Sequence, residues 1–141
     1  MSVFNGNNHK NTIIGSLGDD QIYGKDQADV LFGDNGNDQL FGGKGNDTLY
    51  GGFGDDTLNG GKGNDMMLGG DGADHFNGAL GIDTVSYEDA TGPVLAYVAA
   101  NDSDYGASGD TYDASVENII GSSYDDYLQA GNGGTAFGGG G

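Results

Sequence analysis

The sequence contains no cysteine, no tryptophan and no arginine, and only one proline among its 141 residues. Without cysteine it can form neither a disulfide framework nor a thiolate metal site. Four lysines stand against 22 Asp and Glu, which gives a formal net charge of −18. So strong a negative charge argues against nucleic acid or an anionic membrane surface as a partner. No apolar run approaches the roughly 18 residues of a membrane helix, and the first residues lack the basic start and longer apolar stretch of a signal peptide.

Glycine is the abundant residue, with 31 among 141 positions. Together with the negative charge, this composition taken alone is typical of disorder. Collagen is excluded because there is one proline and no three-residue glycine period. The fold therefore depends on whether the glycines are scattered or regularly spaced.

They are spaced by nine. Nine consecutive nonapeptide units run from Gly6 to Ser86, and all nine begin with glycine. The fourth position is glycine in seven units, with His9 and Gln27 as the exceptions. The eighth position is always apolar: Ile13, Ile22, Leu31, Leu40, Leu49, Leu58, Met67, Phe76 and Val85. The sixth position is Asn11 in the first unit and then always aspartate: Asp20, Asp29, Asp38, Asp47, Asp56, Asp65, Asp74 and Asp83.

Each unit combines a six-residue stretch rich in Gly, Asp and Asn with a three-residue strand such as Thr48-Leu49-Tyr50. Because side chains alternate along a strand, the eighth position points inward while the seventh and ninth point outward. One unit cannot bury a core alone, whereas stacked units form a continuous apolar ladder. A helix is excluded, since each glycine would weaken it by roughly 1 kcal/mol.

Stacked units also stack their aspartates at spacings near 5 Å, where the carboxylates repel one another. Such a column in buried turns needs a counter-charge, and the four lysines cannot supply it. Calcium can, because it takes 6–8 oxygen ligands from carboxylates and backbone carbonyls. Magnesium prefers to keep its water, and no cysteine or paired histidine is present for zinc.

The units resemble the RTX (haemolysin-type) calcium-binding nonapeptide G-G-x-G-x-D-x-U-x, and residues 42–50, 51–59 and 60–68 fit it at every fixed position. The resemblance implies an all-β fold, a parallel β-roll (right-handed β-solenoid) with two nonapeptides per turn. Carboxylates 18 residues apart would then pair: Asp20/Asp38, Asp38/Asp56 and Asp56/Asp74 on one edge, and Asp29/Asp47, Asp47/Asp65 and Asp65/Asp83 on the other. This implies about six calcium ions or more, with a weaker candidate at Asn11/Asp29. Turn carbonyls would complete the shells, among them those of Gly36, Gly45, Gly54, Gly63 and Gly72.

Three segments follow from this pattern: repeats over 6–86, of which the first is degenerate, a β-containing spacer over 87–120, and resumed degenerate repeats over 121–141. The spacer has one alternating run, Val94–Val98. In the last segment Asp126 takes the sixth position and Leu128 the eighth, and Phe137 is expected inside. The sequence is expected to be a fragment of a longer protein, with the remaining polypeptide as its partner.

The resemblance implies a calcium-binding module of a protein exported by a Gram-negative bacterium through type I secretion, which folds on meeting calcium outside the cell. The alternative is a calcium-dependent carbohydrate-binding or adhesion module beside a catalytic domain, as in alginate epimerases. Outward aromatics at the ninth position would form two stacked pairs, Tyr23/Phe41 and Phe32/Tyr50, as a ligand surface or as simple cross-strand packing. Ice binding would need a flat threonine array, which Gln21, Val30, Met66 and His75 interrupt. No H-E-x-x-H or G-x-S-x-G motif is present, so no enzyme activity is expected of this sequence.

Overall fold

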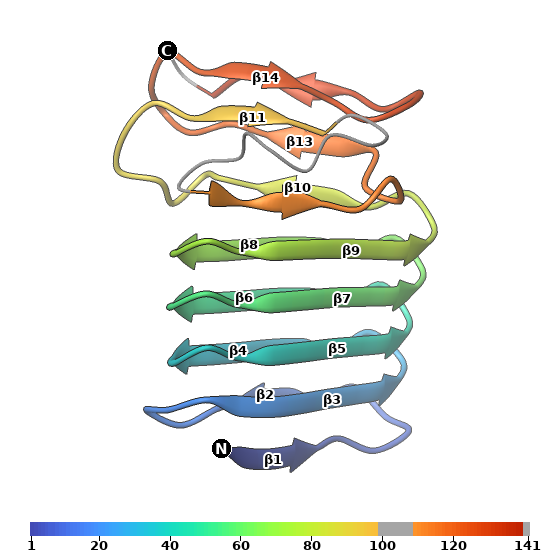
Figure 1. The fold of residues 1–141 in the computed structure, drawn as a ribbon. Helices are drawn as coiled ribbons and strands as arrows, with labels where there is room; N and C mark the ends of the chain where they lie inside the picture. The colour runs from blue at the N-terminus through green and yellow to red at the C-terminus, as the bar shows by residue number, and fades with distance from the viewer. Residues whose placement is uncertain (99–108, 140–141) are drawn as a thin grey trace.

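The computed structural model describes residues 1–98 and 109–139 as a stack of flat coils, with the N-terminus at one end and the C-terminus at the other (Figure 1). The middle of the expected spacer, residues 99–108, lies outside the described range. Every strand pairing is parallel, and within the repeats the paired residues are 18 apart, as in Leu31↔Leu49 and Leu40↔Leu58. The predicted parallel β-roll with two nonapeptides per coil is therefore confirmed.

Two sheets form the sides of the stack. The first sheet has the order β1-β3-β5-β7-β9-β12, and its strands are β1 (Ser2–Asn5), β3 (Asp20–Asp26), β5 (Gln39–Lys44), β7 (Thr57–Lys62), β9 (His75–Leu80) and β12 (Thr111–Tyr112). The second sheet has the order β15-β13-β10-β8-β6-β4-β2, and its strands are β2 (Thr12–Ile14), β4 (Val30–Asn35), β6 (Thr48–Phe53), β8 (Met66–Asp71), β10 (Thr84–Ser86), β13 (Asn118–Ile120) and β15 (Ala136–Phe137). A separate pair joins β11 (Leu95–Tyr97) to β14 (Tyr127–Gln129).

The core is the ladder of eighth-position side chains, which face one another between the two sheets. From Ile22 to Val85 these side chains are fully buried, and Ile13 in the degenerate first unit is partly buried against them. Phe76, Val85 and Ile119 continue the core upward to Val94, Ala96 and Val98 of the expected spacer. The expected inward side chains are therefore confirmed over the whole array.

The glycines allow the turns to pass close to one another. A Cβ on Gly43, whose φ is 112°, would meet the Lys25 carbonyl of the coil below. Among the residues that the structure describes, four other than glycine adopt the same left-handed backbone: Lys25, Gln27, Asp34 and Ala79. Gln27, which departs from the motif at its fourth position, thus keeps the turn conformation of its neighbours with a φ of 77°.

The outer faces carry aromatic ladders. Tyr23 stacks on Phe41 with ring centroids 4.9 Å apart, and Phe32 stacks on Tyr50 at 4.7 Å, so both predicted pairs are confirmed. Phe137, by contrast, is not inside. It pairs with Ile120 in the outward register and is about half exposed, while Ala136 takes the inward register. Among the described residues, no helix is long and apolar enough to span a membrane.

Candidate metal centre

The sixth-position aspartates lie in the turns at the two edges where the sheets meet. Turns that lead from the second sheet into the first form the first edge, with Asp20, Asp38, Asp56 and Asp74; turns in the other direction form the second edge, with Asp29, Asp47, Asp65 and Asp83. All eight side chains are at most 2% exposed. The sequence pattern thus places eight carboxylates in two buried columns.

One carboxylate oxygen of each aspartate ties its coil to the coil below. The N–H of Asp20 donates to Oδ1 of Asp38 at 2.8 Å, and that of Asp38 donates to Oδ1 of Asp56 at 2.7 Å. The second edge repeats this pattern from Asp29 to Asp83, with donor–acceptor distances of 2.7–2.8 Å. All six pairs expected from the spacing are therefore brought together.

The other carboxylate oxygen, Oδ2, has no hydrogen-bond donor in seven of these eight aspartates, and Asp20 is the exception. In the part of the chain that the structure describes, the buried Oδ2 atoms without a hydrogen-bond partner belong to Asp29, Asp38, Asp47, Asp56, Asp65, Asp74, Asp83 and Asp126. Leaving a buried charged oxygen unpaired is costly. The same unpaired oxygen recurs in eight aspartates, which indicates that these oxygens bind a ligand rather than that each is imperfectly packed.

A carbonyl oxygen of the next coil lies beside five of these Oδ2 atoms, in space that the first-position glycine leaves open; the five belong to Asp29, Asp38, Asp47, Asp56 and Asp83. A Cβ on Gly42 would stand 2.5 Å from Asp47 Oδ2 and 2.6 Å from the Gly60 carbonyl oxygen. These two oxygens are therefore at most about 5 Å apart, which is the span of two ligands on one calcium ion at about 2.3–2.6 Å each. Gly24, Gly33 and Gly51 face the same pair of groups, namely the Oδ2 of their own unit and the first-position carbonyl of the coil above.

A comparison with protein-family models matches the chain to the RTX calcium-binding nonapeptide repeat in four copies, at residues 5–40, 32–67, 50–85 and 111–134. The chain belongs to the RTX calcium-binding repeat family. A comparison with curated proteins gave no match. RTX repeats bind calcium, which identifies the chain as a calcium-binding module.

In these RTX repeats the carbonyl oxygens that lie beside an unpaired aspartate Oδ2 belong to first-position glycines, among them Gly42, Gly51, Gly60 and Gly69. Sequence reasoning named the fourth-position carbonyls instead. The carbonyls of Gly36, Gly45, Gly54 and Gly63 point at the fourth-position glycine of the coil above. Their role as ligands, like that of Gly72, stays a prediction.

A second ladder runs outside the aspartates. Fifth-position side chains accept hydrogen bonds from the backbone N–H groups of the next coil, as Asn37 does from Asp55 at 3.1 Å and Asn46 from Asn64 at 3.0 Å. Among the described residues, no three His, Cys, Asp or Glu side chains form a metal-holding cluster. Each coil of these repeats therefore offers one inner carboxylate per edge, and any ion there depends on backbone oxygens for much of its shell.

Burial raises the pKa of these carboxyl groups. Desolvation is the main cause, outweighing the hydrogen bond donated from the coil below, and it raises the pKa of Asp56 and Asp74 to about 7 and of Asp47 and Asp65 to about 6. Asp20 at the lower end differs. Burial acts on it too, but hydrogen bonds from Ser16 and Ser2 outweigh burial and lower its pKa. Its Oδ2 already accepts from the Ser16 N–H and hydroxyl, at 2.6 and 2.8 Å.

The structure adds acidic side chains that sequence reasoning missed. Asp110 is buried and accepts from the Asp74 N–H at 2.8 Å, and Glu117 accepts from the Asp83 N–H at the same distance. The RTX columns thus continue into the segment expected to be a spacer. Asp110 could have been found by counting, because it follows Asp83 by three units of nine. Glu117 is two residues out of that phase and carries no sequence signal.

Proposed function

We propose that this chain is a calcium-dependent folding module, in which the sixth-position aspartates and neighbouring backbone carbonyls hold about six calcium ions or more. The observation that carries the proposal is the set of buried Oδ2 atoms without donors, five of which lie beside a carbonyl oxygen of the next coil. Oxygen ligands of this mixed kind suit calcium.

Charge supports the same function. Six divalent ions add twelve positive charges, which would bring the formal charge from −18 to about −6. Without these ions, the stacked carboxylates repel one another. Burial also opposes the ionised carboxylates and raises the pKa of Asp56 and Asp74. Ion binding and folding are then one event.

Because calcium binding and folding are linked, the calcium concentration determines where the module is folded. Where calcium is scarce the chain stays unfolded, and where calcium is millimolar it folds. We infer that it belongs to a larger polypeptide of a Gram-negative bacterium, exported unfolded by type I secretion and stabilised by calcium outside the cell. The family assignment supports this inference, and catalysis, if the whole protein has any, is assigned to other parts of it.

Circular dichroism tests the proposal on the full chain at pH 7.5. In EDTA the spectrum should be that of a coil, and millimolar calcium should convert it to β-structure, whereas millimolar magnesium at the same ionic strength should not. A chain that is already folded in EDTA contradicts the proposal.

The outer face gives less support to the carbohydrate-binding alternative. Sugar rings stack on free aromatic faces, but the Phe32 and Tyr50 rings lie 4.7 Å apart at 4° and cover one another, and Tyr50 is followed in register by Leu68. Cross-strand packing accounts for these rings. Saturable glycan binding in calcium would favour the alternative.

A further inference from the structure

The two aspartate columns end differently where the regular repeats stop. On the first edge, β10 ends at Ser86, and Asp110 stands directly before β12. On the second edge, residues 113–117 connect β12 to β13, and a tight turn closes this connection with a hydrogen bond from the Val116 N–H to the Asp113 carbonyl at 3.1 Å. The two ends can therefore be compared as possible ion sites.

The second edge repeats the arrangement of the coils below with new residues. The Asp83 N–H donates to Glu117 Oε2 at 2.8 Å, as the Asp65 N–H donates to Asp83 Oδ1 at 2.8 Å. Asp83 is fully buried, and its Oδ2 has no donor. A Cβ on Gly78 would meet this Oδ2 and, at 2.6 Å, the carbonyl oxygen of Ser115. Ser115 thus supplies the carbonyl that a first-position glycine supplies in the repeats.

Glutamate fits this corner because the chain there is shorter. From Tyr112 to Ile119 the chain advances seven positions rather than the nine of a repeat unit, and Val116 turns inward with 1% exposure to pack in the core. The extra methylene of Glu117 lets its carboxylate reach the Asp83 N–H from this displaced backbone position.

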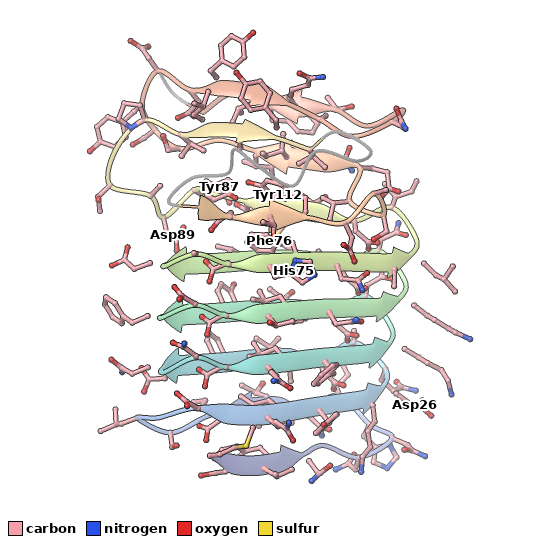
Figure 2. The ribbon with its side chains drawn as sticks, viewed as in Figure 1. Asp26, His75, Phe76, Tyr87, Asp89 and Tyr112 are labelled. Carbon is pink, nitrogen blue, oxygen red and sulfur yellow. The ribbon has the colours of Figure 1, made fainter. Side chains whose placement is uncertain are left out.

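On the first edge, Asp74 holds the place of Asp83, and its Oδ2 likewise has no donor, but the carboxylate above it is closed. Asp110 Oδ1 accepts from the Asp74 N–H at 2.8 Å, and its Oδ2 accepts from the Tyr87 hydroxyl at 2.7 Å. The Tyr87 hydroxyl is also hydrogen-bonded to that of Tyr112. Both rings lie against Phe76, which Tyr112 stacks at 5.5 Å (Figure 2). A neutral donor thus pairs with Asp110 Oδ2, whereas the Oδ2 atoms of Asp56 and Asp74 below it have no donor.

We propose that Asp83, Ser115 and Glu117 hold a further calcium ion above the last regular repeat of the second edge, while on the first edge the Tyr87 hydroxyl takes the Oδ2 of the uppermost aspartate, Asp110. This inference rests on the proposed function, since it extends the same chemistry to residues outside the nonapeptide motif. It assigns Glu117 and the Ser115 carbonyl as ligands and makes the segment after Ser86 part of the calcium-binding array.

Counting ions in the full chain tests the proposal. Equilibrium dialysis at pH 7.5 with calcium saturating the unmodified protein gives the reference number of ions per chain. Glu117→Ala removes both carboxylate oxygens and should bind one ion fewer. Glu117→Gln keeps an acceptor for the Asp83 N–H but loses the charge, so its weakest ion should bind at least tenfold more weakly. Circular dichroism in calcium should show both variants folded, because the lower sites stay intact.

Glu88→Gln is the matched control. Glu88 is exposed, and the substitution removes the same charge outside the proposed site. Its ion count and affinities should equal those of the unmodified protein. If both Glu117 variants bind the same number of ions as this control with the same affinities, the inference is wrong while the proposed function stands. If the unmodified protein binds no calcium, the proposed function itself fails.

Discussion

Replacing Gly42 by alanine is the sharpest probe of the oxygen pairs between coils. Gly42 is not among the positive-φ residues, so alanine introduces no backbone strain there. Its Cβ would stand 2.5 Å from Asp47 Oδ2, 2.6 Å from the Gly60 carbonyl oxygen and 2.9 Å from Asp47 Cβ. The substitution therefore acts on the two oxygens assigned to one ion and on little else.

Its magnitude follows from two opposing effects. Forcing a methyl group into packed space lowers the free energy of unfolding by about 1–3 kcal/mol, while the less flexible unfolded chain returns about 0.4–1 kcal/mol. Losing an ion present at a hundred times its Kd removes about 2.7 kcal/mol more. We expect a net loss of roughly 3–5 kcal/mol, which for a chain of this length lowers Tm by roughly 10 °C or more.

Thermal unfolding in saturating calcium, followed by circular dichroism and paired with an ion count, measures both effects. Gly18→Ala is the control, because a Cβ on Gly18 meets nothing within 4 Å and Gly18 is not among the positive-φ residues. It should leave the ion count unchanged and Tm within a few degrees. If Gly42→Ala unfolds at the same temperature as Gly18→Ala and binds as many ions, the assignment of these oxygens is refuted.

Two further outcomes follow. In calcium-free buffer, acidification from pH 7.5 to 4.5 should increase β-structure. Burial raises the pKa of Asp56 and Asp74 in the fold to about 7, above the 3.8 of an ordinary aspartate, so the fold binds more protons than the coil across this window and its stability falls as pH rises. Circular dichroism showing more structure at pH 7.5 would contradict this. Ala79→Gly should raise the free energy of unfolding by about 0.5–1 kcal/mol, because Ala79 holds a φ of 72° that disfavours a side chain by about 1–2 kcal/mol. Ala73→Gly, at an exposed position without positive φ, should instead lower it, and equal shifts in thermal melts of the two variants would count against the strain argument.

The regular part of the fold was predictable because its contacts are set by a local period. Once Leu40 and Leu58 are known to occupy the same position two units apart, stacking determines their pairing, their inward direction and the placement of Asp38 beneath Asp56. The Phe32/Tyr50 stack follows from the same register. In this region nearest neighbours in space are fixed distances apart in sequence.

The upper end could not be predicted in this way. Leu95 pairs with Tyr127, 32 residues further on, and Asn118 pairs with Thr84 at a separation of 34, so no single spacing applies. The inward position of Phe137 was wrongly predicted because counting by nine does not detect the displaced register of Ala136. The role of Tyr87 depends on a hydroxyl reaching Asp110 across 23 residues, which only the folded path reveals.

The 18-residue register also determines how the length of the array can change. Removing residues 42–59 would delete one whole coil. Each later unit would then take the place of the unit 18 residues before it, so every later strand stays in its sheet and every later carboxylate at its edge. Removing nine residues would move each later strand to the opposite sheet. The Tyr87 corner and the Glu117 corner would then sit above the wrong columns. Insertions and deletions that preserve both ends of this protein therefore come in multiples of 18 residues, although the sequence motif repeats every nine.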